Sequence, residues 1–533
     1  MFRKLTGLIV AAAMIVMQGI PCSTALAASD LTDGGASKTI DANAAKTLKK
    51  TTISASTQEA NKWNTASDKI ADTAKASPDK VDVAAFTTEL NNYATAAKAS
   101  YDKTGTKFDT STADKNYLTA ANAFVKSDAF AKLSEAQQNK FVNAVAKLSI
   151  EIWRGSDSKS EKTAMYAQIG EFYKNAYNKS ATVSAKAHTV DSLLYVFMIV
   201  KQNDATGATK LLKAGLKVSG GMEAVTSLLK SNINNAKLTD DQRSRMAIVA
   251  TKLLSLEKYV KQASGYDMSD TMKSGLKAQI NSFTEKVNSG DVKLSAWYRA
   301  RLVYWTGNLS TKLVKAKEAN SGANKTFVDN AVTLAHKTML LAESKGGSVY
   351  AQSVAISSLT VMNNAAAKAK NTDVTKDTKA ALTDKDFNVK DYLANAKTSM
   401  AKETSADRAA VIAKASVRIV TKNVEYKTGA VDAAMVENVL DNVKNWTSTK
   451  ANLLDMRHLT SQKNLFVSVA DLAVQLKKDS SEVKFSDAMK KDVESIKEAA
   501  EGLADDDIKK AAVKELDDAL KAKDENAKPK PMK

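Results

Sequence analysis

The sequence predicts an all-α protein, built either as multi-helix bundles or as an irregular α-solenoid of roughly fifteen to twenty helices, with no significant sheet. The first observation behind this prediction is the distribution of proline. Between Pro78 and Pro529 the chain runs for 450 residues without one, where average usage of about 5% would place roughly 22. Proline costs about 3 kcal/mol inside a helix because it removes a backbone donor and clashes with the preceding turn. A proline-free stretch rich in Ala, Lys, Leu and Met is therefore typical of consecutive helices.

The second observation is that apolar residues recur at helical spacing. In the segment 243–260 they line one face, at Met246, Val249, Leu253, Leu256 and Val260. Similar stripes occur in the segments 141–152 and 465–476. No convincing run alternates apolar and polar residues as a half-buried strand would.

The third observation is a series of helix start and stop signals. Ser134 with Gln137, and Thr239 with Gln242, have the spacing of capping boxes, in which each side chain satisfies a free backbone donor of the other residue. Glycines that can end helices follow at suitable distances, at Gly155, Gly220, Gly221, Gly265 and Gly290. No repeat of fixed period is evident, so paired bundles and an irregular stack of helical hairpins both stay open.

The N-terminal residues 1–27 predict a secretory signal peptide. Arg3 and Lys4 form its basic region, Leu8 to Met17 its apolar region, and Ala25-Leu26-Ala27 a small-x-small cleavage site. An uncleaved membrane anchor is the alternative, but the apolar run is too short to span a bilayer. Lipidation of Cys22 is a further alternative, and it is disfavoured because Pro21 stands where a small residue normally precedes such a cysteine.

Cleavage after Ala27 would remove the only cysteine of the chain. The remaining 506 residues could bury a sizeable core without disulfides, and they could carry no thiolate nucleophile, cysteine-based zinc site or iron–sulfur cluster. The longest later apolar run, Leu193 to Val200, has eight residues and is interpreted as a buried helix. We therefore expect a soluble exported protein without a transmembrane segment.

Composition divides the exported chain into successive parts. Residues 28–55 are rich in Ser, Thr, Ala, Gly and Asp and are interpreted as a flexible leader. A main helical domain is expected over 56–370, and its division into two subdomains stays open. Residues 371–388 are interpreted as a linker or exposed loop, with an amphipathic helix as the alternative because Ala and Lys propagate helices well. A C-terminal helical domain over 389–524 and a disordered basic tail over 525–533 complete the chain.

The formal net charge of +19 indicates anionic partners. The basic residues of the chain are overwhelmingly lysines, with arginine at only nine positions. For an exported protein the expected partners are anionic cell-envelope polymers or lipid headgroups, contacted through lysine-rich faces and the basic tail. The alternative is that lysine only keeps a helical surface soluble. Specific nucleic-acid binding ranks lowest, since lysine lacks the fork geometry of arginine and no binding motif is present.

The sequence provides no pattern of catalytic, cofactor-binding or metal-ligating residues. Its three histidines, His188, His336 and His458, are far apart and belong to no zinc-hydrolase motif. His458 is the one with charged neighbours, and on a helix Asp455 would share its face, although no nucleophile stands beside it. Phosphate-binding loops, nucleophile elbows and dinucleotide fingerprints are absent from the sequence.

Two acidic segments are interpreted as helix starts. The segment 384–395 begins like a calcium loop, but Val389 occupies the position of the required glycine and Asn395 that of the bidentate glutamate. The run Asp505-Asp506-Asp507 would favour the positive end of a helix that begins there.

The candidate ligand- or partner-binding residues lie in one aromatic cluster and are Trp297, Tyr298, Arg301, Tyr304 and Trp305. On a helix, positions 297, 301 and 305 fall on one side, so Arg301 could lie between two indoles, or the rings could face a sugar or a protein partner. The alternative is a seam that buries the aromatic rings between helices, as aromatic residues at helical spacing usually are.

Taken together, these features predict an exported, non-enzymatic helical protein of the cell envelope or surface, with a scaffold or adhesion role. In being cysteine-free and rich in Lys, Ala, Thr, Ser and Asn, the exported chain resembles helical surface-layer and envelope scaffold proteins as a class. The alternatives are a periplasmic or secreted helical binding module for a ligand or protein, and a secreted glycan hydrolase. Two convergent carboxylates, one with a raised pKa, would support the hydrolase.

Overall fold

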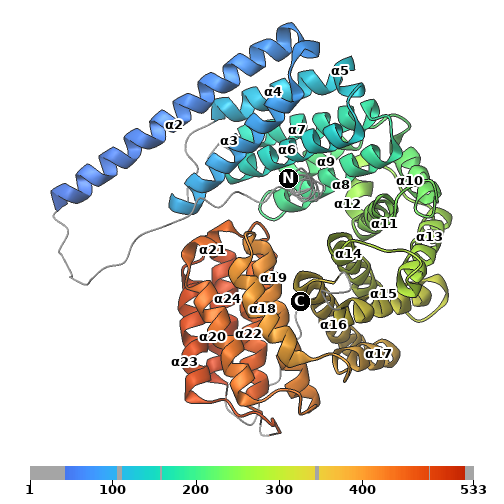
Figure 1. Ribbon diagram of the computed structural model, residues 1–533, viewed down its shortest axis with the longest axis vertical. Helices are drawn as coiled ribbons and strands as arrows, with labels where there is room; N and C mark the ends of the chain where they lie inside the picture. The colour runs from blue at the N-terminus through green and yellow to red at the C-terminus, as the bar shows by residue number, and fades with distance from the viewer. Residues whose placement is uncertain (1–41, 105–110, 156–158, 342–346, 479, 523–533) are drawn as a thin grey trace, which may run out of the picture. The chain divides into compact units, whose positions relative to one another are not determined.

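The computed structural model describes residues 42–104, 111–155, 159–341, 347–478 and 480–522. Within these ranges it contains 23 α-helices, one 3-10 helix and no strand (Figure 1), so the prediction of an all-α fold is confirmed. The helices slightly outnumber the expected fifteen to twenty because some connections hold short helices, such as α5 (Asp128–Ala131) and α21 (Lys450–Asp455). The expected signal peptide and basic tail lie outside the described residues.

The chain folds into two compact units, which meet in sequence between Ala181 and Thr182. This boundary differs from the one expected at 371–388. The linker interpretation of that segment is wrong for most of its length, because α16 (Val349–Ala369) is followed at once by α17 (Thr372–Leu382). Asn371 caps α17 by accepting a hydrogen bond from the backbone N–H of Val374, and the helix buries a narrow face of small and apolar residues. The helical alternative for this segment is therefore correct.

The flexible leader expected over 28–55 is also wrong for the part that the structure describes. Helix α2 spans Ala42–Ala76, whereas the sequence placed the first helix from about residue 56. Ala, Lys and Gln have high helix propensity and can extend a helix without an apolar stripe to mark it. Residues 28–41 lie outside the described part of the chain.

The first unit consists of helices packed around an aromatic core. Helix α4 (Ser111–Lys126) packs between α2 and α7 (Lys159–Lys179), while α3 (Val83–Thr104) packs against α6 (Glu135–Arg154). These helix pairs run parallel, as Asn64 with Ala113 and Asp68 with Asn116 show for α2 and α4. The core contains rings in edge and tilted contact, from Phe86, Phe124, Phe130, Phe141 and Phe172.

The second unit is a two-layered stack of helical hairpins. In its first layer each helix packs against the next, in the order α8 (Val183–Val200), α11 (Asp240–Ser255), α14 (Ala296–Lys315), α16, α19 (Ala406–Tyr426), α22 (Leu459–Leu476) and α24 (Asp506–Lys521). The second layer forms two shorter runs, α10 (Gly221–Asn232) to α13 (Asp270–Ser289), α15 (Gly322–Leu340) and α17, and then α18 (Val389–Lys402), α20 (Ala433–Thr447) and α23 (Asp487–Glu501). Helices α9 (Ala205–Gly215) and α12 (Glu257–Ser264) pack together beside the start of the first layer. This arrangement corresponds to the α-solenoid alternative.

Helix ends follow the predicted signals closely. Both capping boxes, at Ser134 and Thr239, are formed. Gly265 and Gly290 end their helices in the left-handed region, with φ of 74° and 91°. Gly220 and Gly221, by contrast, stand at the start of α10 instead of ending a helix. The two acidic helix starts are confirmed, with Asn388 capping α18 and Asp505 capping α24.

Helix α8 is the one helix of the described residues whose length and apolar composition would suffice to cross a membrane. In the structure 78% of this helix is buried. A core helix of a soluble domain can have the same length and apolar composition. Six of the eight residues from Leu193 to Val200 are buried, and Tyr195 and Met198 are half-buried. The prediction of a buried helix for this run is thus confirmed.

The first layer of the second unit closes on itself through Gln202, directly after α8. Its Nε2 donates to the carbonyl oxygen of Arg457 at 3.0 Å, and its Oε1 accepts from the backbone N–H of Leu459 at 2.8 Å. The rings of Tyr195 and His458 lie beside this contact, with centroids 6.2 Å apart. The row of helices α8, α11, α14, α16, α19 and α22 is therefore joined at its two ends by these contacts, and each of its helices has a side away from the second layer. We call these sides the central face.

Candidate binding face

The five predicted cluster residues all lie on α14, but the structure treats them differently. Trp305 is buried, with 6% of its surface exposed, whereas Trp297, Tyr298 and Arg301 are half-buried. Tyr304 is 50% exposed, the one large apolar side chain so exposed among the described residues. The helix begins after Ser295, whose hydroxyl accepts from the backbone N–H of Tyr298. The cluster is thus divided into a buried part, as in the seam alternative, and an exposed part.

Arg301 reaches across the central face to α8. Its Nη2 donates to Oδ2 of Asp191 at 2.6 Å, and its guanidinium carbon lies 5.8 Å from the centroid of the Trp297 ring. The expectation that Arg301 lies between two indoles is correct for Trp297 and wrong for Trp305. It is Lys252, on α11, whose Nζ lies over the Trp305 ring, at 5.1 Å. The carboxylate of Asp191 explains the difference, because it draws Arg301 towards α8.

Asp191 is a buried carboxylate that two cations share. It accepts hydrogen bonds from both Arg301 and Lys252. Burial alone would raise its pKa, but the two cations outweigh burial and hold the pKa below its ordinary range. At Lys252, burial and repulsion by Arg301 lower the pKa more than attraction by Asp191 raises it. The pKa of Lys252 therefore falls to about 8. With both cations protonated, this cluster carries an excess positive charge.

Tyr298 is held in place by the neighbouring helix. Nη2 of Arg245, on α11, donates to the Tyr298 hydroxyl at 2.5 Å, and Nη1 donates to the hydroxyl of Ser184 on α8 at 3.3 Å. Arg245 therefore joins α8, α11 and α14, and its bond to Tyr298 has a structural role in the described structure.

The cation–aromatic contacts continue from α14 onto α16 and α19. Tyr350 stacks on Trp297, with ring centroids 6.1 Å apart and planes at 21°. The guanidinium of Arg408 lies 5.8 Å from the Tyr350 ring, and Glu403 accepts from Arg408 at 2.7 Å. Arg301, Trp297, Tyr350 and Arg408 thus form a row, the arginine–aromatic ladder, with a cation at each end.

Tyr304 projects beside this ladder. Its ring meets Trp305 edge to face at a centroid distance of 5.1 Å. Burial by the surrounding protein raises the pKa of Tyr304, although half of its surface reaches solvent. Tyr304 is thus an aromatic residue open to solvent next to the buried Trp305.

His458 has a different carboxylate partner from the one that its neighbours in sequence suggested. Asp455 ends α21, and the residues after it are not helical, so the shared helix face does not exist. Nδ1 of His458 lies 3.2 Å from Oδ1 of Asp407, at the start of α19. The backbone N–H groups of Arg457 and His458 also donate to Asp407. Burial raises the pKa of Asp407, but His458 and Arg457 outweigh it and keep the pKa low.

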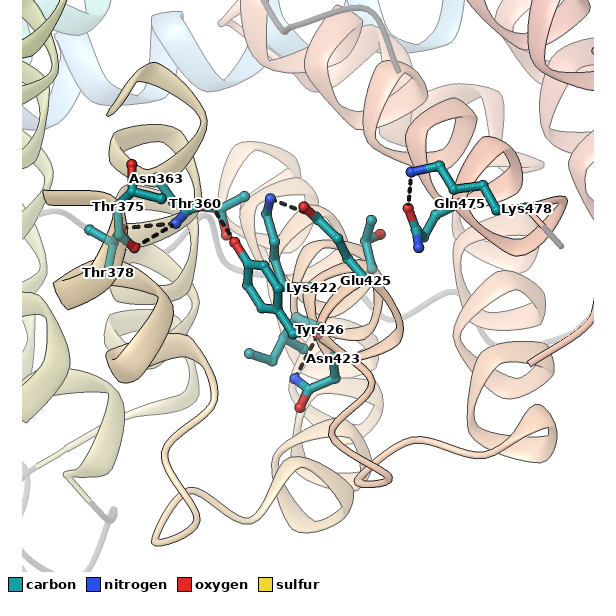
Figure 2. A network of polar contacts seen from close by, with 12 residues as sticks. Thr360, Asn363, Thr375, Thr378, Lys422, Asn423, Glu425, Tyr426, Gln475 and Lys478 are labelled. Carbon is teal, nitrogen blue, oxygen red and sulfur yellow. Dashed lines mark hydrogen bonds and ion pairs between the residues drawn. The ribbon is translucent and has the colours of Figure 1, made fainter. Parts of the chain in front are cut away.

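A second polar network lies at the C-terminal end of α19 (Figure 2). Lys422 pairs with Glu425 at 2.7 Å, and the Tyr426 hydroxyl donates to Oδ1 of Asn363 at 2.7 Å. The amide of Asn363 then donates to the Thr378 hydroxyl at 3.0 Å. These contacts join α16, α17 and α19, which explains why the segment expected to be a linker is part of the fold.

The described residues contain no group of three or more His, Cys, Asp or Glu side chains that could hold a metal ion. In the segment that begins like a calcium loop, Asp384 accepts from the N–H of Asp386 and pairs with His336 at 2.7 Å. Asn388 and Asp391 are engaged in the cap of α18. Asp384 is thus engaged in a turn and an ion pair, and Asp391 in the helix start.

Sequence reasoning missed the partners of the predicted cluster, among them Asp191, Lys252, Tyr350 and Arg408, and it missed Asp407, the partner of His458. One signal could have indicated the first of them. Asp191 is the single charged residue between His188 and Val200, in the most apolar of the helices that the structure describes. A buried carboxylate in such a setting needs a cation from elsewhere in the fold.

No protein-family model matches this chain, and no curated protein matches it in sequence.

Proposed function

We propose that this chain is an exported, non-enzymatic helical protein of the cell envelope, with a scaffold or adhesion role, that binds anionic envelope polymers on its central face. The observation that carries the proposal is the sharing of Asp191 by Arg301 and Lys252 directly beside the exposed Tyr304 and the arginine–aromatic ladder. An anionic group would compensate the excess positive charge of this cluster.

The chemistry of the face suits an acidic glycan. Flat aromatic rings can pack against sugar rings, and guanidinium groups bind carboxylates and phosphates in a bidentate manner. Only nine arginines occur in the chain, and Arg245, Arg301, Arg408 and Arg418 are all on first-layer helices. The abundant surface lysines would add a non-specific attraction to the same polymer or to lipid headgroups.

Export is part of the proposal, and the pattern of residues 1–27 supports it. Cell fractionation with N-terminal sequencing of the purified protein tests it. We expect the protein outside the cytoplasm, with Ala28 as its first residue. A cytoplasmic protein that retains Arg3 and Lys4 would contradict export.

Binding to isolated cell envelopes over a range of salt concentrations tests the electrostatic part. We expect binding to weaken as the Debye length falls from about 10 Å at 0.1 M salt to about 3 Å at 1 M. Binding that does not change with salt would contradict an electrostatic contact.

The Tyr304→Ala variant tests the place of binding. It should weaken binding on the order of tenfold, as losing an aromatic contact of about 1–2 kcal/mol would. Trp446→Ala is the matched control, since Trp446 is a half-buried aromatic residue on α20 in the second layer. Equal binding by both variants would place the contact away from the central face.

One observation favours the glycan hydrolase as a second candidate. Burial raises the pKa of Asp471, on α22, to about 7, and Glu515 and Glu425 add to the effect. A carboxyl group that keeps its proton near neutral pH suits a general acid. Release of reducing ends from an acidic glycan, lost in Asp471→Asn, would favour catalysis over binding.

A further inference from the structure

Lys414 is a buried lysine without a counter-ion. It lies in the middle of α19 with only 9% of its surface exposed. Within the described part of the chain its ammonium group makes no hydrogen bond and no ion pair. Buried charges in proteins are normally paired, because burying an isolated ammonium group is costly.

The charges nearest to Lys414 do not compensate it. Arg418 follows one turn later on the same side of α19, and its charge repels that of Lys414. Asp407 attracts Lys414, but its oxygens already accept from His458 and from two backbone N–H groups. As a result, burial and, to a smaller extent, repulsion by Arg418 lower the pKa of Lys414 to about 7.

Arg418 is held rigidly between two neighbouring helices. Its Nε donates to the Ser468 hydroxyl on α22 at 3.2 Å, and its Nη1 donates to the carbonyl oxygen of Ser357 on α16 at 3.5 Å. Burial lowers the pKa of Arg418 to about 10. This value is still well above neutral pH, and the guanidinium therefore stays charged there.

Three of the helices packed against α19, namely α22, α16 and α18, bring titratable groups near these residues. Helix α22 brings Asp471 near Arg418, and the residues before it bring His458 to Asp407. Helix α16 brings Tyr350, which is within electrostatic reach of Asp407, Arg408 and Arg301. Helix α18 contributes the Tyr392 hydroxyl, which is 2.8 Å from that of Ser353. Lys414 and Arg418 are thus connected to the arginine–aromatic ladder through Asp407 and Tyr350.

We propose that Lys414, with Arg418 beside it, binds one anionic group, a carboxylate or a phosphate, of a ligand on the central face. The ligand would supply the counter-ion that the fold leaves out. The ammonium of Lys414 offers a point charge, and the fixed guanidinium of Arg418 orients the anion. This inference rests on the proposed function, because it names a subsite for the same anionic polymer.

Binding at this subsite should take up protons. An anion next to Lys414 favours its charged form, so at pH 8 a proton is drawn from solvent when the ligand binds. Affinity should fall as the pH rises from 6 to 8.5, because Lys414 loses its charge. Asp471 adds to the same trend, since it becomes anionic over this range.

The test uses isothermal titration calorimetry on the full chain with two probes, an oligogalacturonate for carboxylates and a short polyphosphate for phosphates. Lys414→Met should weaken the binding of the recognised probe on the order of 10- to 100-fold, as the loss of a charged contact does. Lys368→Met is the matched control, because Lys368 is exposed on α16. It removes the same charge and should change affinity less than about twofold.

Two further measurements separate binding from structure. Lys414→Arg should keep the affinity and lose much of its pH dependence, because even a buried arginine such as Arg418 stays charged between pH 6 and 8.5. Lys414→Met should raise the melting temperature of the free protein, since it removes an unpaired buried cation. A lysine with a purely structural role would give the opposite shift.

The outcomes distinguish this inference from the proposed function. If a probe binds the wild type and Lys414→Met behaves like Lys368→Met, the subsite is refuted while polymer binding stands. If neither probe binds the wild type at low salt, both proposals fail. If Lys414→Met loses affinity for only one of the two probes, that probe identifies the anionic group as a carboxylate or a phosphate.

Discussion

At the scale of single residues, Asp191 pairs with two buried or half-buried cations of the second unit, Lys252 and Arg301. Asp191→Asn would leave Arg301 and Lys252 without their carboxylate, and breaking a buried pair in this way costs about 3–5 kcal/mol. We expect a loss of that order in the free energy of unfolding, measured by urea denaturation. Asp373→Asn, at an exposed position in the first turn of α17, is the control and should change stability by less than about 0.5 kcal/mol.

The low pKa of Asp191 gives this contribution a defined pH dependence. Its pKa in the folded state is below the value of about 3.9 expected for the unfolded chain. The stabilisation is therefore complete above about pH 4 and is lost as the pH falls towards the folded pKa. As the pH is lowered from 7 to 3, the free energy of unfolding should fall more steeply for the wild type than for Asp191→Asn. Parallel curves would contradict this role of Asp191.

Trp305 and Tyr304, adjacent in sequence, should respond to alanine in opposite ways. Trp305 is buried, so Trp305→Ala should cost about 3–5 kcal/mol of stability, read from denaturant midpoints. Tyr304→Ala should cost about 1 kcal/mol or less and act on ligand binding instead. Equal destabilisation by the two variants would mean that both rings belong to the core.

At the scale of helices, α17 is the element on which sequence and structure disagreed most. Its apolar face is only Val374, Ala381 and Leu382, which is too little to predict a buried helix from sequence. Asn371→Ala would remove the cap of this helix and should cost about 1 kcal/mol, seen as faster hydrogen exchange over 372–382. Unchanged exchange would favour the exposed loop that the composition suggested.

The capping boxes and the aromatic side of α14 could be predicted because they depend on residues three or four positions apart. Ser134 with Gln137, and Trp297 with Arg301, need only the geometry of one helix. The contact of Arg301 with Asp191 spans 110 residues and depends on how non-adjacent helices pack. No periodicity in the sequence records that packing, so the partners of the cluster required the structure.

The solenoid itself was hidden for a related reason. Hydrogen bonds between neighbouring first-layer helices join residues 50, 53 and 57 positions apart, as in the pairs Arg418 with Ser468, Arg245 with Tyr298, and Lys312 with Ser255. The spacing is similar from hairpin to hairpin but not constant. A search for a fixed repeat therefore finds nothing, although the architecture is repetitive.

At the scale of the second unit, Gln202 closes the first layer. Gln202→Ala would remove both hydrogen bonds that tie α8 to the residues before α22. We expect faster hydrogen exchange at the end of α8 and around Leu459, with little change on α14. Unchanged exchange at both ends would contradict the joining of the two ends of this row of helices.

We propose that anionic polymers bind specifically on the central face of the second unit, while the lysine-rich outer surface adds only a non-specific attraction. Hydrogen exchange of the full chain with and without an oligogalacturonate tests it most directly. We expect protection of α14 around 297–305 and of α19 around 407–418, with the protection of α19 reduced in Lys414→Met. Protection confined to second-layer helices, or spread evenly over exposed lysines, would contradict it.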